Sequence, residues 1–386
     1  MRKFYTAEAV TEGHPDKLCD QIADAILDVC LKQDEQSRVA CEVLATKGTI
    51  IVAGEITSTY EPDVFAVVRK VLSDVGYSSE GIAMDTFVHR QSPDIAGAVD
   101  TSKERREGVS DNQIDWFQGA GDQGVMIGYA CDETKQLMPM PVVLANRIVR
   151  ELSACRQSSY IQGILPDGKA QVTVEYENGK PVRLDSVVVS CQHTEDKNLK
   201  KLEAEIRKKV LLPALRLLPP DEDTKIFINP SGRFVCGGMD ADTGLTGRKL
   251  MVDSYGSMVP HGGGAFSGKD CSKVDRSVAY MARYIAKNIV AARLASRCQV
   301  SLAYAIGVAQ PVMVQVDTFG TGKVCADDCL ELAIPLVFGL TPKQIVDSLR
   351  LTRPIFRQTA AFGHFGRKEF PWERTDKVEA LRNAVI

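Results

Sequence analysis

The sequence lacks any apolar run approaching the ~18 residues that a membrane-spanning helix needs. It also lacks an apolar secretory segment at its start, because Met1 to Glu8 turns polar within a few residues. Neither sign of charge dominates, since 47 Lys and Arg residues face 50 Asp and Glu residues for a net charge of −3. We therefore expect a cytoplasmic protein with no membrane partner, and no nucleic-acid-binding surface as its main purpose.

A zinc site or a disulfide framework is not indicated either. The 11 cysteines are an odd number and are scattered through apolar segments. Cys325 and Cys329 form the closest pair, with no second pair or nearby histidine to complete a zinc site. The pattern is typical of reduced, buried thiols in a cytosolic protein.

The length of 386 residues exceeds what one ordinary core supports, while 44% hydrophobic and 25% charged residues are typical of globular proteins. We expect three domains. The predicted boundaries are 1–112 for the N-terminal domain, including a loop at about 91–113, then 113–231 for a central domain and 232–386 for a C-terminal domain.

One order of elements recurs along the chain. Residues 16–34 have the apolar periodicity of a helix, and residues 38–57 read as two strands joined at Lys47-Gly48. A second helix over 64–75 follows, with Asp63 placed to cap its start and Gly76 to end it.

Two further copies of this order follow, and the hairpins begin near residues 38, 170 and 298, a spacing of roughly 130. The second copy has a helix, a hairpin and a helix at 142–156, 170–191 and 199–212; the third has them at 277–294, 299–319 and 342–349. A strand-like segment precedes each first helix, at 4–10, 125–130 and 250–255. The pattern predicts an α+β fold of three similar domains related by pseudo-threefold repetition, each a β-sheet covered by helices.

Two polar segments need separate interpretation. Asp20, Asp24 and Asp28 form a stripe on the first helix, which we expect to be solvated. Residues 91–113 form a long polar stretch outside the repeat; such loops are functional or disordered, and here we favour a mobile lid.

The richest stretch is Pro260 to Arg276, PHGGGAFSGKDCSKVDR. Its consecutive glycines can turn backbone N–H groups toward one anion, and Lys269 and Lys273 can add positive charge there. Asp275 can cap the helix that follows or hold a metal. The stretch fits the P-loop pattern up to Lys269, but Asp270 replaces the hydroxyl residue that would hold Mg²⁺. This favours polyphosphate binding by a different geometry, against a purely structural glycine turn.

Other acids and cations accompany glycines elsewhere. The run from Glu12 to Lys17 places His14 and Asp16 just before a helix, whose N-terminus favours anions. Glu42 and Glu55 are acidic residues within strand patterns, where an unpaired carboxylate is costly and a cation would resolve it. The remaining motifs are Gly119-Ala-Gly-Asp122-Gln-Gly124, Pro166-Asp167-Gly168-Lys169, Asn229-Pro-Ser-Gly232-Arg233-Phe234 and Asp242-Thr-Gly-Leu-Thr-Gly247-Arg248-Lys249. Together they predict a site for a metal-bound polyphosphate, although each alone can be structural.

At these residues the chain resembles the S-adenosylmethionine synthetase family, from about Ala7 to Trp372. The motifs that carry the resemblance are Glu12-Gly-His-Pro-Asp-Lys17, Gln91-Ser-Pro-Asp-Ile95, Gly119-Ala-Gly-Asp-Gln-Gly124, Gly244-Leu-Thr-Gly-Arg-Lys249 and His261-Gly-Gly-Gly-Ala-Phe-Ser-Gly-Lys-Asp270. The resemblance implies that methionine sulfur attacks C5′ of ATP, and that the released triphosphate is hydrolysed to pyrophosphate and phosphate. It also implies two Mg²⁺ and K⁺ as cofactors, and homodimers or homotetramers with active sites between subunits.

The resemblance further implies residue roles. His14 would lie by the leaving 5′ oxygen, and Lys169, Arg248, Lys249 and Lys269 would hold the triphosphate. Asp16 and Asp275 would bind Mg²⁺, and Glu42 would bind K⁺. The methionine pocket would contain Glu55, Gln91, Asp122 and Lys273. Asp167, Arg233, Phe234 and Ala265 would contact ATP, with Asp242 between the two substrates.

This sequence departs from the family pattern in two places. Residues 102–116 look like an insertion relative to bacterial members, which puts the timing of the lid in doubt. Met239 and Ala241 stand where many relatives have Pro and Gly. Two alternatives stay open: a phosphoryl-transfer enzyme that forms ADP, and a catalytically inactive regulatory paralogue, which we would expect to lack His14, Lys169 or Lys269.

Overall fold

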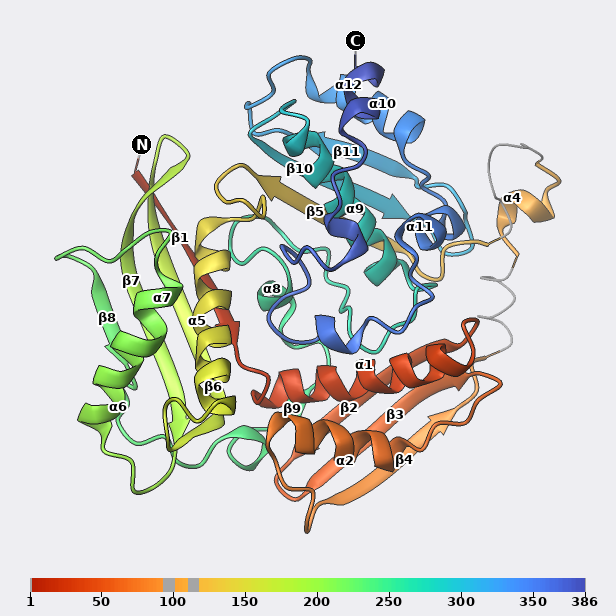
Figure 1. Ribbon diagram of the computed structural model, residues 1–386. Helices are drawn as coiled ribbons and strands as arrows, with labels where there is room; N and C mark the ends of the chain where they lie inside the picture. Colours follow the sequence, from red (N-terminus) through yellow and green to blue (C-terminus); the bar gives the residue numbers. More distant parts are fainter. Residues whose placement is uncertain (1, 93–100, 110–117, 386) are drawn as a thin grey trace.

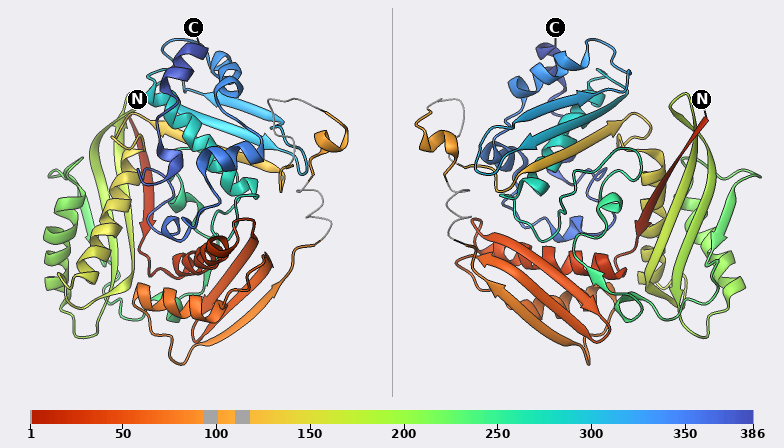
Figure 2. Two further views of the ribbon diagram at one scale, coloured as in Figure 1. Left: turned by 45° about the vertical axis from the view of Figure 1, so that its right-hand side comes forward. Right: turned by 180° about the vertical axis from the view of Figure 1, so that it is seen from behind.

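The computed structural model describes residues 2–92, 101–109 and 118–385. Three β-sheets, each with its own helices, surround a central region that contains helix α8 (Leu250–Asp253) and part of residues 350–373, which we call the C-terminal segment (Figure 1). In the view from behind, strands of all three sheets lie on the side nearer the viewer (Figure 2, right). The predicted α+β fold with three sheets is confirmed.

The first sheet contains β4 (Ala83–His89), β3 (Thr49–Thr57), β2 (Arg38–Thr46) and the short β9 (Gly244–Leu245), in that order. The hairpin β2–β3 turns at Lys47-Gly48 as predicted, with Gly48 at φ 71°. Strand β4 pairs parallel with β3, and helix α2 (Val64–Val75) makes the crossover that a parallel pair requires.

The second sheet has the order β1 (Arg2–Val10), β6 (Ile164–Glu177), β7 (Lys180–His193) and β8 (Lys225–Ile228). Its hairpin turns through Asn178 and Gly179, both in the left-handed region that such two-residue turns require. The third sheet has β11 (Met313–Asp317), β10 (Arg297–Tyr304) and β5 (Gly124–Cys131).

The three units exchange strands in a cycle. The strand before α1 (Pro15–Gln33) joins the sheet of β6, the strand before α5 (Met140–Gln157) joins β10, and β9, which precedes α9 (Val274–Ala291), joins β2. Each sheet therefore contains a strand from another unit. The predicted boundary near 112 lies outside the described residues, and the boundary at 231 falls in the turn Asn229–Gly232, so both remain predictions.

The predicted helices largely match the structure. Asp63 caps α2 by accepting the Ala66 N–H at 2.9 Å, and Gly76 ends it in the left-handed region. Helix α11 (Pro342–Leu349) has the predicted limits. Residues 199–214 form α6 (Leu199–Ile206), a π-helical turn (Arg207–Leu211) and α7 (Leu212–Ala214) rather than one uniform helix.

The strand predicted at 250–255 is wrong. Residues 250–253 form α8, and the strand of this unit is β9, six residues earlier in the chain. The apolar run misled the prediction because its Val252 and Tyr255 are buried against other elements of the molecule rather than in a sheet. Strands β4 and β8 and helices α10 (Asp327–Val337) and α12 (Val378–Ala384) were not predicted.

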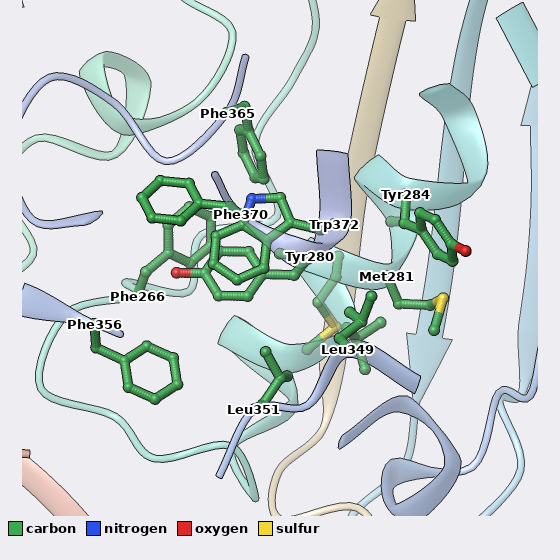
Figure 3. Packing of buried hydrophobic residues seen from close by; sticks show 14 of the residues in the cluster. Phe266, Tyr280, Met281, Tyr284, Leu349, Leu351, Phe356, Phe365, Phe370 and Trp372 are labelled. Carbon is green, nitrogen blue, oxygen red and sulfur yellow. The ribbon is translucent and has the colours of Figure 1, made fainter. Parts of the chain in front are cut away.

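Many of the aromatic side chains of the core gather around α9. Tyr280 stacks on Trp372 with ring centroids 3.7 Å apart, and Phe266 meets Phe365 edge-on (Figure 3). Phe266 also meets the His364 ring edge-on. Phe266 belongs to the glycine-rich stretch, so its burial fixes the middle of that loop to the C-terminal segment.

In the described part of the chain, no single helix has the length and apolar character to cross a bilayer; only the bent pair α10 and α11 meets those two criteria together.

Candidate active site

Two loops that carry the predicted cations lie along the same edge of strand β2. Residues 244–246 pair with it at one end, where Thr246 N–H bonds to Val43 O at 3.0 Å. Residues 268–270 pair with it at the other, where Cys41 N–H bonds to Gly268 O at 2.9 Å. The loops touch each other, because a Cβ added at Gly247 would lie 2.6 Å from the Ala265 Cβ. Arg248, Lys249 and Lys269 are thereby brought to one region.

Helix α1 covers these loops with its acidic side, and the expectation that this stripe is solvated is wrong. Asp20 and Asp24 are fully buried and Asp28 is largely buried. Lys17 Nζ lies 2.9 Å from Asp20, and Arg276 Nη1 lies 2.6 Å from Asp24. The carboxylates were misassigned because the cations that pair with them come partly from α9, 252 residues away in the sequence.

His14 is the N-cap of α1, and its ring performs the capping. The Asp16 N–H donates to His14 Nδ1 at 3.2 Å, so the proton of the neutral ring resides on Nε2. Burial, followed by the positive charges of Lys249 and Lys169, lowers the pKa of His14 to about 3. The site therefore holds a neutral imidazole that can donate one hydrogen bond from Nε2.

Asp16 is two residues after His14 and is almost fully buried. Its Oδ1 accepts the Leu245 N–H at 3.0 Å, and its Oδ2 lies 2.5 Å from Lys249 Nζ. Arg248 Nε is 3.5 Å from Oδ1. Burial alone would raise the pKa of this carboxyl, but the bonds from Lys249 and Leu245 hold it below its usual value.

A second carboxylate–lysine pair repeats this arrangement at the start of α9. Asp275 is the second residue of that helix, as Asp16 is of α1, and its Oδ2 lies 2.6 Å from Lys269 Nζ. A Cβ on Gly264 would lie 2.1 Å from Asp275 Oδ1, so the glycine loop passes directly over the carboxylate. Lys273 pairs instead with the buried Asp270, which also accepts the Val39 N–H at 2.7 Å.

The predicted nucleotide residues lie beside the α1 terminus but are less tightly held. Lys169 is exposed on β6, yet close enough to lower the pKa of His14. Asp167 is buried, accepts the Gly238 N–H at 2.8 Å, and has its pKa raised by burial. Arg233 pairs with the exposed Glu195 at 2.7 Å. The Phe234 N–H donates to His193 Nε2 at 3.0 Å, and the Phe234 carbonyl accepts the His193 N–H at 2.9 Å. Asp242 is exposed after the turn that contains Met239.

The residues predicted for methionine and K⁺ lie on the sheet side. Glu42 lies between the two loops on β2, and burial raises its pKa, which Thr246 and Lys269 partly counteract. Glu55 on β3 contacts His89 at 3.3 Å, and the Gln91 N–H bonds to Thr57 at 3.1 Å. Asp122 is exposed before β5. Within residues 2–92, 101–109 and 118–385, no hydrogen bond or ion pair joins Gln91 or Asp122 to the cluster of His14, Asp16 and their cations at the N-terminus of α1.

Sequence reasoning missed a buried charge network beneath this cluster. Lys17 Nζ binds Asp253 Oδ1 at 2.5 Å as well as Asp20, and burial raises the pKa of Asp253 to about 7. Both carboxylates together raise the pKa of Lys17 against the effect of burial. The available signal was the four-residue spacing of the aspartates on a helix whose other positions are mostly small or apolar.

We expect His14 to remain neutral well below pH 6.5. Nitrogen NMR of histidine-labelled protein should show, at pH 5, a His14 ring protonated on Nε2 alone, with the His14→Asn variant identifying its signals among the five histidines. A doubly protonated His14 at pH 5 would contradict the geometry.

The same shift predicts a pH dependence of stability. The unfolded chain takes up a proton on His14 near pH 6.5, whereas the folded protein does so only near pH 3. The unfolded state therefore binds more protons within this window, so His14 lowers stability as pH falls from about 6.5 to 3, by about 1.4 kcal/mol per pH unit. The difference in unfolding free energy between wild type and His14→Asn, measured across this range, should follow that slope.

Comparison with protein families finds matches along nearly the whole chain. The model described as S-adenosylmethionine synthetase, N-terminal domain, matches residues 2–99; the central-domain model matches residues 117–234; and the C-terminal-domain model matches residues 236–374. The three matches follow one another and cover nearly the full chain, which confirms the resemblance found in the motifs.

Proposed function

Because the chain belongs to the S-adenosylmethionine synthetase family and so makes S-adenosylmethionine from ATP and L-methionine, we propose that the cluster at the N-terminus of α1 is its active site. The observation that carries the proposal is the convergence of residues 14–17, 244–249 and 269–275, which bring cations and carboxylates of three distant segments together.

The reaction determines what these residues must do. Methionine sulfur attacks C5′ of ATP and the triphosphate leaves, to be hydrolysed to pyrophosphate and phosphate. A thioether is a neutral nucleophile and needs no base, so the site must orient an in-line attack and stabilise the charge of the leaving group. A cluster that is rich in cations and contains no evident general base among its described residues fits this requirement.

His14 is suited to the leaving oxygen. Its Nε2–H is directed by the hydrogen bond that its other ring nitrogen accepts from Asp16 N–H, so the donor is fixed before substrate binds. With a pKa of about 3 the ring is neutral at physiological pH, and its one remaining N–H acts as a hydrogen-bond donor. It would stabilise negative charge developing on the 5′ oxygen.

The cations rest on carboxylates in this structure. Lys249 and Lys269 neutralise Asp16 and Asp275, and we infer that a bound triphosphate would draw these lysines, with Arg248 and Lys169, onto its own oxygens. Asp16 and Asp275 would then be free to hold Mg²⁺. Phosphate-bound Mg²⁺ is typically held by one or two protein carboxylates, which matches this donor set, and it would supply further neutralisation of the triphosphate. Within residues 2–92, 101–109 and 118–385, no three His, Cys, Asp or Glu side chains form a metal site without substrate.

Glu42 is our candidate ligand for K⁺, which the family generally uses. Its carboxylate lies on the strand between the two cation loops, and burial raises its pKa. Glu42 itself is exposed in the single chain, so a weakly held monovalent cation would reach its carboxylate without competing with Lys269 for the triphosphate.

We further propose that the site is completed by a second copy of the chain in a dimer or tetramer. The cation cluster is open to one side, where the Arg248 side chain is 47% exposed. Glu55, Gln91, Asp122 and Lys273 would form the methionine pocket, with Asp242 between the substrates. Asp167, Arg233, Phe234 and Ala265 would surround the nucleotide. Contributions of Gln91 and Asp122 from the partner would explain their separation from the α1 cluster.

A product assay tests the activity and its alternatives. Protein supplied with ATP, L-methionine, Mg²⁺ and K⁺ should yield S-adenosylmethionine, pyrophosphate and phosphate by mass spectrometry, with no S-adenosylmethionine when methionine is omitted. ADP as product would favour phosphoryl transfer, and an inert, folded protein would favour a regulatory paralogue.

About half of the lid predicted at 91–113 lies outside the described residues, but its helix α4 (Lys103–Arg106) makes definite contacts. The Lys103 N–H bonds to Gly307 O at 2.8 Å, and the Glu104 carboxylate accepts the Ala309 N–H at 2.9 Å. We expect trypsin to cleave between Lys103 and Arg106, more slowly with both substrates bound. Glu104→Ala should speed cleavage of the free protein; equal rates with and without substrates would contradict a role in the reaction.

A further inference from the structure

The acidic stripe of α1 contacts the loops in a regular way. Four aspartates at four-residue intervals each accept backbone N–H groups from a loop that crosses the helix. Asp16 accepts from Leu245 at 3.0 Å, Asp20 from Gly247 at 2.9 Å, Asp24 from Gly268 at 2.8 Å, and Asp28 from Phe356 and Arg357, both at 2.9 Å. One helix face thus anchors three segments that are far apart in the sequence.

The close approach of the anchored loops leaves no space for a side chain at two of their glycines, Gly244 and Gly268. A Cβ on Gly244 would lie 2.2 Å from Pro15 O at the start of α1. A Cβ on Gly268 would lie 1.9 Å from Cys41 O and 3.2 Å from Ala23 Cβ, and Gly268 also has φ +80°. The loops are therefore clamped between α1 and strand β2.

The middle two aspartates hold the residues next to the proposed triphosphate cations. Gly247, bound by Asp20, immediately precedes Arg248 and Lys249, and Gly268, bound by Asp24, immediately precedes Lys269. We propose that Asp20 and Asp24 are positioning residues, which touch no substrate but fix the backbone from which these cations reach the triphosphate. The proposal rests on the assignment of Arg248, Lys249 and Lys269 to the triphosphate made above.

The chemistry of the anchors suits this role. Both carboxylates are fully buried, so water does not compete for them, and each is charge-paired: Asp20 with Lys17, and Asp24 with Arg276 through two bonds of 2.6 and 2.8 Å. Arg276 also donates to Lys269 O at 3.1 Å, which fixes that loop from its other side. The positive charges of Arg248, Lys249 and Lys269 repel one another when they are brought close together. Rigid anchoring of their backbone by buried carboxylates holds them in place before the triphosphate binds.

Variants of Asp20 separate the anchor from its charge. Asp20→Ala removes the acceptor for Gly247, whereas Asp20→Asn keeps an oxygen acceptor at the same place, and Lys17 retains Asp253 in both. We expect Asp20→Ala to weaken tripolyphosphate binding, measured by calorimetry, and to lower kcat for S-adenosylmethionine formation, each at least tenfold, with a smaller change in KM for methionine. Asp20→Asn should restore both to within about threefold of wild type.

Asp28 supplies the matched control, because it anchors residues 356–357 and no cation loop. Asp28→Asn should leave kcat and tripolyphosphate affinity within twofold of wild type, even if it lowers the midpoint of thermal unfolding. Asp24→Asn is preferred to Asp24→Ala, since Ala would leave the buried guanidinium of Arg276 without its only carboxylate partner among the described residues. Asp24→Asn should lower kcat and tripolyphosphate affinity more than Asp28→Asn and less than Asp20→Ala.

The outcomes distinguish failure of the positioning role from failure of the assignment of Arg248, Lys249 and Lys269 to the triphosphate. Wild-type tripolyphosphate affinity in folded Asp20→Ala would overturn the positioning role, and so would equal losses in Asp20→Ala, Asp20→Asn and Asp28→Asn, which would indicate general weakening of the fold. Lys249→Met and Lys269→Met belong in the same titration. If they bind tripolyphosphate like wild type, the assignment of the cations fails instead.

Discussion

Replacing His14 should reduce S-adenosylmethionine formation by a factor of about 10² to 10³, the usual cost of one hydrogen-bond donor aimed at developing charge. His14→Asn is the sharper variant, because an asparagine side chain can still cap α1 while no donor reaches the position of Nε2. His14→Ala should show the same loss of kcat and an additional loss of stability of about 1 kcal/mol from the missing cap. Steady-state kinetics and thermal unfolding of both variants measure the two effects separately.

The loss should fall on cleavage of the C5′–O bond rather than on binding. Affinity for ATP should change little in His14→Asn, and hydrolysis of added tripolyphosphate should decline less than S-adenosylmethionine formation, since that reaction does not break the C5′–O bond. A kcat within threefold of wild type would show that the fixed Nε2–H plays no part in stabilising the leaving oxygen.

Replacing Lys269 should be comparably severe. Lys269→Met keeps the aliphatic length but removes the charge, and we expect kcat to fall at least about 10²-fold because a cation that stabilises the leaving triphosphate is lost. Tripolyphosphate affinity should fall as well. Lys269→Arg, which keeps the charge with a different geometry, should retain more activity than Lys269→Met.

Two comparisons identify the origin of that loss. Lys70→Met removes an exposed lysine that pairs with Asp74 on α2, and it should leave kcat unchanged. Lys269→Met combined with Asp275→Asn tests the resting pair: if Lys269 acted only to neutralise Asp275 at 2.6 Å, the double variant would recover activity. We expect no recovery, because both side chains have separate tasks once the triphosphate binds.

Local sequence signals predicted much of the fold. Asp63 and Gly76 predicted both ends of α2, and the turns at Lys47-Gly48 and Asn178-Gly179 predicted two hairpins, because caps and tight turns depend on a few adjacent residues. The strand expected at 250–255 was wrong because an apolar run of that length is equally compatible with a buried helix, and only the surrounding elements distinguish the two.

The sequence by itself determined the family and the reaction, because these are carried by contiguous motifs such as Gly244 to Lys249 and His261 to Asp270. It also determined the three-unit α+β architecture, because the order of helices and hairpins recurs along the chain. Tertiary structure alone decided the cyclic exchange of strands and the burial of the acidic stripe on α1. Strand pairing and charge pairing of this kind join residues more than 200 positions apart, such as Asp24 with Arg276, and no local pattern records which distant partner removes a carboxylate from water.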